Sequence, residues 1–204
     1  MKKIFCLIIG LFVFSLGYCQ TAEQYYEMGL SKAKHQDYKG AIADYSKVID
    51  LNTNVSYTLF AYSDRALLKA ELKDHPGAVA DFTKAIDILP NSADNYHNRG
   101  LSKAALGDHR GAIVDFNQAI GLNYNDSEVY NNRGVSKMNL SDNRGAITDY
   151  TMAIEINPNF AIAYQNRGLA KLKIGEKDSG CLDFSKAGEL GDEMAYQLIK
   201  DLCN

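Results

Sequence analysis

The sequence predicts an all-α fold, a solenoid of five helix–turn–helix units closed by a helix at its C-terminal end. Three observations lead to this prediction. The string Asn-Arg-Gly occurs three times, beginning at Asn98, Asn132 and Asn166, so successive copies are 34 residues apart. Apolar residues recur at steps of three and four, as in an α-helix, and no useful length alternates with the period of two expected of a strand. Self-similarity at a fixed period of this length is the signature of a repeat architecture.

Other positions obey the same step and set the boundaries of the units. They form four columns: Tyr62, Tyr96, Tyr130 and Tyr164; Ala66, Gly100, Gly134 and Gly168; Phe82, Phe116, Tyr150 and Phe184; and Ala85, Ala119, Ala153 and Ala187. An earlier unit fits after a three-residue insertion near residues 54–57, with Tyr25 and Gly29 in the matching positions. We therefore expect the solenoid at 22–194, with units at 22–58, 59–92, 93–126, 127–160 and 161–194.

Each unit is predicted to form two antiparallel helices. In the third unit, Tyr96, Gly100 and Ala104 lie near one stripe of the first helix, and a small residue such as Gly100 lets the second helix approach closely. Asp108 then follows a turn and is well placed to cap the second helix. The same slot holds Asp37, Asp74 and Asp142 in other units. One such pair cannot bury its apolar face alone, so neighbouring units must stack.

The C-terminal residues 193–204 are predicted to form a capping helix, because the last face of a solenoid must be covered. Aligning this helix with the preceding units places Cys203 roughly level with Cys181 in an antiparallel pair. We therefore predict a disulfide between Cys181 and Cys203, whose loop would contribute about 3 kcal/mol on the entropy model. The alternative is two separate buried thiols.

The N-terminal residues 1–19 have the pattern of a secretory signal peptide. Lys2 and Lys3 precede an apolar run at residues 4–16, and small residues follow it. This run is shorter than the roughly 20 residues that span a membrane. We therefore expect an exported chain with no membrane-spanning segment.

Two kinds of processing fit the end of this segment. Cleavage after Cys19 would give a periplasmic or secreted protein. Acylation of Cys19 would give an outer-membrane lipoprotein instead, although Tyr18 is bulky where that motif has a small residue. After either cleavage Cys181 and Cys203 would remain in a compartment where disulfides persist.

A helix–turn–helix unit of this length, with these aromatic and small columns and a late proline at Pro90 and Pro158, resembles the tetratricopeptide repeat (TPR). The resemblance covers five units and points to an exported bacterial member of the family. It implies a right-handed superhelix with a concave groove lined by the first helix of each unit. The sequence departs from the family pattern in two columns, where apolar residues and tyrosines are common: Arg65, Arg99, Arg133 and Arg167; and Lys32, Lys69, Lys103, Lys137 and Lys171.

These basic columns have two interpretations, because a column of acids recurs with them. The acids are Asp44, Asp81, Asp115, Asp149 and Asp183. In the favoured interpretation, Arg and Asp form a charge ladder between helices that fixes the stacking geometry. In the other, the basic residues form a stripe for an acidic partner or an anionic polysaccharide.

The column of Asn98, Asn132 and Asn166, with Asp64 in the same slot of the second unit, is the candidate binding site. Asn is a mediocre helix former, and its amide both donates and accepts hydrogen bonds, which suits a peptide backbone. Some TPR proteins, including the glycosyltransferase that adds N-acetylglucosamine to nuclear and cytoplasmic proteins, use an Asn ladder in this groove column. The alternative is that these side chains bond within their own helix or to a neighbouring unit.

Catalytic motifs are missing from the sequence. We find no Gly-rich phosphate loop, no HExxH motif and no nucleophile elbow. We therefore expect no enzymatic activity, no cofactor and no metal site. With a net charge of −3 and no long basic stretch, we expect no nucleic-acid partner. The function predicted from the sequence is binding of a peptide or protein segment in the concave groove. The alternative is a structural scaffold of a bacterial envelope assembly, with a lipid anchor at Cys19 as one possibility.

Overall fold

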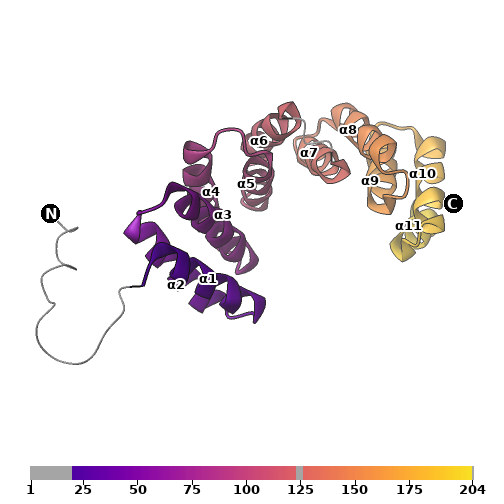
Figure 1. The fold of residues 1–204 in the computed structure, drawn as a ribbon. Helices are drawn as coiled ribbons and strands as arrows, with labels where there is room; N and C mark the ends of the chain where they lie inside the picture. Colours follow the sequence, from indigo (N-terminus) through magenta and orange to yellow (C-terminus); the bar gives the residue numbers. More distant parts are fainter. Residues whose placement is uncertain (1–19, 123–125, 204) are drawn as a thin grey trace, which may run out of the picture.

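The computed structural model describes residues 20–122 and 126–203, and in these two stretches the chain forms eleven α-helices and no strand (Figure 1). The helices are α1 (Ala22–Lys34), α2 (Tyr38–Leu51), α3 (Val55–Glu71), α4 (His75–Ile88), α5 (Ala93–Ala105), α6 (His109–Gly121), α7 (Ser127–Asn139), α8 (Asn143–Ile156), α9 (Ala161–Lys173), α10 (Lys177–Glu189) and α11 (Glu193–Leu202). The predicted all-α helical repeat is confirmed. The predicted signal segment, residues 1–19, lies outside the described residues.

The helices pack as five successive pairs, from α1 with α2 to α9 with α10, and each pair also packs on the next. The first helices of neighbouring pairs contact one another, as in α3 with α5 and α5 with α7. The pairs follow an arc in Figure 1, and the first helices lie on its inner side. The concave surface is therefore built from α1, α3, α5, α7 and α9.

Four of the five second helices begin at the predicted aspartate caps, whereas α10 begins after Glu176 without a side-chain cap. Asp108 accepts a hydrogen bond from the backbone N–H of Gly111 at 2.9 Å, which satisfies one of the unpaired donors of the first turn. The caps Asp37, Asp74 and Asp142 make the same bond to Gly40, Gly77 and Gly145. A Cβ at Gly111 would collide with the Asp108 carboxylate. The glycine that follows each cap therefore leaves room for the capping group.

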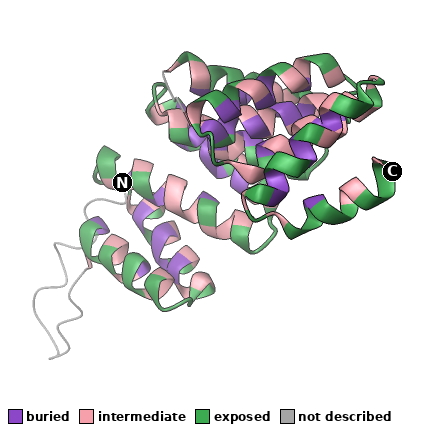
Figure 2. Cartoon of the chain, turned by 90° about the vertical axis from the view of Figure 1, so that its right-hand side faces the viewer, coloured by how far each residue is buried: buried purple, intermediate pink, exposed green. Residues whose placement is uncertain are grey.

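Close approach of the two helices in a pair depends on the small column of the first helix. A Cβ at Gly100 would lie 2.7 Å from the ring of Phe116, and one at Gly134 would lie 2.7 Å from the ring of Tyr150. Both rings are fully buried. Figure 2 shows the buried residues gathered where helices face one another. The second unit has Ala66 at this position, also fully buried.

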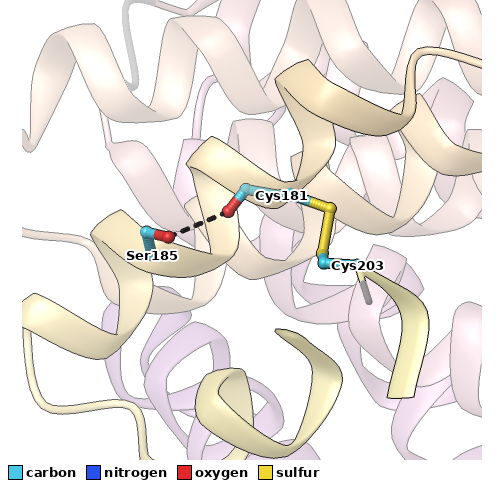
Figure 3. The surroundings of a disulfide bond; sticks show 3 residues. All are labelled: Cys181, Ser185 and Cys203. Atoms are coloured by element: carbon cyan, nitrogen blue, oxygen red, sulfur yellow. Dashed lines mark hydrogen bonds between the residues drawn. A yellow bond between two sulfur atoms is a disulfide. The ribbon is translucent and has the colours of Figure 1, made fainter. Parts of the chain in front are cut away.

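The C-terminal helix α11 packs on α10 and covers the end of the last pair. Ala195 of α11 is buried against Phe184 and Ala187 of α10. The sulfur atoms of Cys181 and Cys203 are bonded at 1.98 Å, with the two Cα atoms 5.9 Å apart (Figure 3). The structure thus places the predicted pair together, and the bond would tie the end of α11 to α10.

The three-residue insertion near residues 54–57, which the predicted bounds place at the end of the first unit, is absorbed by the first helix of the second unit. Helix α3 has 17 residues and begins at Val55, whereas α5 has 13. It starts before residue 59, where the spacing of the repeats puts the beginning of this unit. The additional turn carries Tyr57 onto the concave side, beside Tyr26 of α1.

Candidate functional site

Three positions of every first helix form the concave surface. The column of Gly29, Ala66, Gly100, Gly134 and Gly168 faces the second helix of its own pair. At 3.6 residues per turn, the positions six before, two before and one after that column lie about 100° to 160° around the helix, away from this partner. We call them the inner columns: Glu23, Phe60, Asp94, Glu128 and Ile162; Glu27, Asp64, Asn98, Asn132 and Asn166; and Leu30, Leu67, Leu101, Val135 and Leu169.

The inner columns combine apolar, amide and acidic side chains, and none of their members is basic. Several apolar members are well exposed, with Phe60 at 48%, Leu67 at 44% and Ile162 at 47%. The acids Glu23, Glu27, Asp64, Asp94 and Glu128 all belong to the first four units. Lys34 and Lys173 lie near this surface only in the last turns of α1 and α9.

The predicted binding residues are placed on this surface, but each already has a partner. Asn98 donates to the backbone oxygen of Asp94 in its own helix at 2.9 Å. Asn166 donates to Oδ1 of Asn131 at 3.0 Å, across α9 and α7. Asp64 accepts a hydrogen bond of 2.7 Å from the Tyr26 hydroxyl, across α3 and α1.

Asn132 continues this pattern between α7 and α5. Its Nδ2 lies 3.3 Å from Nε2 of His97, and its Oδ1 lies 3.5 Å from Nδ2 of Asn131. Asp64, Asn132 and Asn166 therefore each link their own first helix to the preceding one, through the residue one position before the matching slot of the preceding unit. The sequence analysis did not predict Tyr26, His97 and Asn131 as the partners in these links. The sequence signal for them was their position, since each directly precedes a member of the column that contains Asn98 and Asn132.

These amides keep part of their hydrogen-bonding capacity. Each Asn side chain has two donors and one acceptor oxygen. Among the described residues, the Oδ1 atoms of Asn98 and Asn166 accept no hydrogen bond. Both side chains are partly exposed. They could therefore accept from a ligand without giving up the bonds they already make.

An aromatic–acidic patch lies at the N-terminal end of the concave surface, between α1 and α3. We define it as Tyr26, Tyr57, Phe60 and Asp64. The Tyr26 ring lies 5.5 Å from that of Tyr57 and 6.1 Å from that of Phe60, measured between centroids. Burial raises the pKa of the Asp64 carboxyl, although the hydrogen bond from Tyr26 acts in the opposite direction. Burial and Asp64 also raise the pKa of the Tyr26 hydroxyl, so this group stays a donor.

An apolar hollow of about 100 Å³ lies between the first helices α3 and α5. Its lining includes Leu67, Asn98 and Leu101 of the inner columns and Phe82 of the second helix α4. Because inner-column residues form its rim, the hollow belongs to the concave surface. Asn98 is thus the predicted binding residue that borders an apolar recess.

The recurring Arg, Lys and Asp residues form ion pairs between helices. In the third unit, Arg99 and Lys103 of α5 both bind Asp115 of α6, with N–O distances of 2.7 and 2.8 Å. The second, fourth and fifth units repeat this arrangement, with N–O distances between 2.6 and 2.8 Å. The predicted charge ladder is confirmed. In each of these four units the arginine and the lysine both bind a buried aspartate. The alternative, a basic stripe for an acidic partner, therefore loses its support.

Groups for metal binding or membrane crossing were not found in the part of the chain that the structure describes. Within residues 20–122 and 126–203, no three His, Cys, Asp or Glu side chains are arranged to hold a metal ion. Across the same residues, no helix has the length and apolar character needed to cross a membrane.

Comparison with known proteins agrees with this repeat architecture. Residues 93–126 and 127–160 each match the family model of the tetratricopeptide repeat. No curated protein sequence matches the chain significantly. A crystal structure of MamA superposes with a TM-score of 0.76 and 26% sequence identity, covering 83% of this chain and 97% of MamA.

Two further solved structures share the fold. YrrB, described as a TPR protein with an unusual peptide-binding site, has a TM-score of 0.77 and 21% identity, covering 89% of this chain and 92% of its own. MamA from Desulfovibrio magneticus RS-1 has a TM-score of 0.77 and 15% identity, covering 83% and 94%. With two units matched to the family and five stacked helix pairs in the same arrangement, the chain is a tetratricopeptide repeat protein.

Proposed function

We propose that this TPR protein is a non-enzymatic interaction module that holds an extended segment of a partner protein along its concave surface. The fold itself is that of a protein–protein interaction module. The observation that supports the site is the composition of the inner columns, where exposed apolar side chains stand beside amides with a free acceptor. The peptide-binding site of YrrB belongs to that protein, and its likeness to this chain supports the fold alone.

The spacing of the Asn column suits an extended ligand. Packed helices lie about 8–10 Å apart, and an extended chain advances about 3.3 Å per residue. Asn98, Asn132 and Asn166 would therefore contact ligand residues that are about three positions apart. Asp64 would accept from the backbone at the N-terminal end, where the groove has a carboxylate in place of the amide.

Export is part of this proposal. The N-terminal pattern described above supports it, and so does the bonded pair of Cys181 and Cys203, because disulfides persist in oxidising compartments. A second candidate function is a scaffold that docks through its C-terminal end. It is favoured by exposed apolar side chains there, with Leu182 at 71%, Met194 at 65% and Tyr196 at 59%.

A comparison of captured partners tests the groove. The purified protein and a variant with Asn98, Asn132 and Asn166 changed to Ala would be incubated with a native envelope extract, and bound proteins identified by mass spectrometry. Gln118→Ala, which removes an exposed amide from the second helix α6, is the matched control. We expect the triple variant to lose partners that the control keeps.

Folding must be separated from binding in this comparison, because Asn132 and Asn166 also link helices. A second variant, Phe60→Ser with Leu101→Ser, changes only exposed side chains of the inner columns. It should lose the same partners while its melting temperature stays close to that of the parent. Partners that persist in both variants would contradict the groove and direct attention to the C-terminal end.

A further inference from the structure

The groove carries a negative charge that nothing in the described structure compensates. Glu23, Glu27, Asp94 and Glu128 are exposed and make no ion pair with any described residue. Glu23, Asp94 and Glu128 lie in the first turns of their helices, where a negative charge also stabilises the helix. Most lysines and arginines of these helices bind buried aspartates, and the exception, Lys34, lies in the last turn of α1. A ligand near Glu23, Asp94 and Glu128, in the first turns, therefore meets carboxylates without a neighbouring lysine or arginine.

The aromatic–acidic patch has the groups that bind a cationic side chain. Phe60 presents nearly half of its surface to solvent, and Tyr57 lies beside it, so a guanidinium or ammonium group can rest on an aromatic face. Asp64 lies on the same helix one turn later and is partly withdrawn from water. Glu23 raises the pKa of the Tyr57 hydroxyl, so a second carboxylate lies close to the patch.

The apolar hollow lies one helix interval further along the groove and has a different chemistry. Leu67 and Leu101 form its rim, and both remain more than one-third exposed. An aliphatic or aromatic side chain placed there would cover this surface and gain the free energy of apolar burial. The Asn98 amide at the same rim can accept a hydrogen bond from the ligand backbone.

We propose that the groove selects segments that carry a lysine or arginine and an apolar residue about three or four positions apart. The basic side chain binds the aromatic–acidic patch, and the apolar side chain fills the hollow. This inference rests on the proposed function and specifies the ligand. The inner columns of the fifth unit, Ile162, Asn166 and Leu169, are uncharged, so the charge selection acts at the N-terminal half of the groove.

Binding of three synthetic peptides of equal length, measured by fluorescence anisotropy on the purified protein, tests the proposal. The first repeats Lys and Leu three positions apart in a Gly/Ser background. The second replaces every Lys by Glu, and the third replaces every Leu by Ser. We expect the first to bind at least about tenfold more tightly than either of the others. Its affinity should fall as salt is raised, because the carboxylates are exposed to screening.

Matched variants locate the binding. Asp64→Asn keeps an acceptor for Tyr26 and, with Glu23→Gln, removes two groove charges. Asp50→Asn with Glu155→Gln removes two exposed charges from the second helices α2 and α8. The groove pair should lower affinity for the Lys–Leu peptide about tenfold, and the outer pair should not change it.

The apolar position has its own pair of variants. Leu101→Ser alters the hollow, and Val114→Ser alters an exposed valine of α6 outside the groove. Only the first should weaken binding of the Lys–Leu peptide. Because all these side chains are exposed or conservatively replaced, the melting temperatures of the variants should stay close to that of the parent.

The outcomes separate this inference from the proposed function. Equal or tighter binding of the Glu–Leu peptide, or no binding of any peptide, would overturn the ligand chemistry. Captured partners lost in the Asn98, Asn132 and Asn166 variant would then still support the groove as a binding site. The inference would also be overturned if the outer charge variant weakened binding of the Lys–Leu peptide as much as the groove variant did.

Discussion

Arg99 donates two hydrogen bonds to Asp115 across the third helix pair, from Nε at 2.9 Å and from Nη2 at 2.7 Å. Its remaining nitrogen, Nη1, donates to Thr83 of the preceding unit at 3.1 Å. The guanidinium also lies over the ring of Tyr96, with its carbon 5.5 Å from the ring centroid. One side chain therefore joins α4, α5 and α6, and the arginines of the other units repeat this contact. These arginines therefore also join each helix pair to the one before it.

Loss of the aspartate should destabilise the protein more than loss of the arginine. Asp115 is 1% exposed, so Asp115→Ala leaves Arg99 and Lys103 facing each other without a counter-charge. We expect it to lower the free energy of unfolding by about 3 kcal/mol. Arg99→Met leaves Lys103 to neutralise Asp115, and we expect a loss of about 1–2 kcal/mol.

The first unit provides a natural precedent for this comparison. It has Met28 in the arginine position, and Lys32 alone pairs with Asp44 at 2.6 Å. Denaturant titrations followed by circular dichroism would measure both variants against the parent. Equal losses for Asp115→Ala and Arg99→Met would show that the guanidinium, rather than the buried carboxylate, controls stability.

Two glycines of the small column should respond differently to alanine. A Cβ at Gly100 would lie 2.7 Å from the buried Phe116 ring, which must move aside, and this cost opposes the roughly 1 kcal/mol of helix propensity that alanine contributes. A Cβ at Gly168 would also lie 2.9 Å from the backbone oxygen of Gly180, which cannot move freely. We expect Gly168→Ala to lower the melting temperature and Gly100→Ala to change it little. Thermal melts would compare them, and a larger loss for Gly100→Ala would contradict the backbone argument.

Much of the fold was predictable because the relevant signals are local. The 34-residue step, the capping aspartates and the small column each express a contact within one helix pair. The capping position of Asp108 and the pairing of Arg with Asp were predicted in this way and are confirmed. The pair of Cys181 and Cys203 could also be placed, because α11 continues the register of the preceding first helices.

The details of the groove were less predictable because they depend on how one unit is turned relative to the next. Asn132 meets His97 and not Asn98, since neighbouring first helices are displaced by about one residue along the contact. The aromatic–acidic patch depends on the longer helix α3, and the insertion alone did not show whether it would form a loop or helix. To predict which side chains meet between units, one must know the superhelical rotation from one unit to the next. The sequence of a single unit does not contain this information.

Reduction of the disulfide should loosen the capping helix first. The bond closes a loop of 22 residues and holds Cys203, at the end of α11, to α10. On the entropy model Cys203→Ser would destabilise the C-terminal end by about 3 kcal/mol. Thiol titration of the unfolded, unreduced protein should find neither thiol of Cys181 and Cys203 free, and two free thiols would contradict the bond. Hydrogen exchange measured on Cys203→Ser and on the parent should then show a larger increase in rate for α11 than for α5.

Acidification should destabilise the contact between α5 and α7. Burial lowers the pKa of His97 below its usual value near 6.5, although Asp126, Glu128 and Asp94 act in the opposite direction. Below about pH 6.5 the unfolded chain therefore binds a proton that folded His97 does not, so stability falls as the pH drops toward the folded pKa. His97→Asn removes this term and keeps an acceptor for Asn132, as Asn131 does for Asn166. Thermal melts at pH 7 and pH 5 should show a smaller decrease for the variant, and an equal decrease would show that other groups control the acid response.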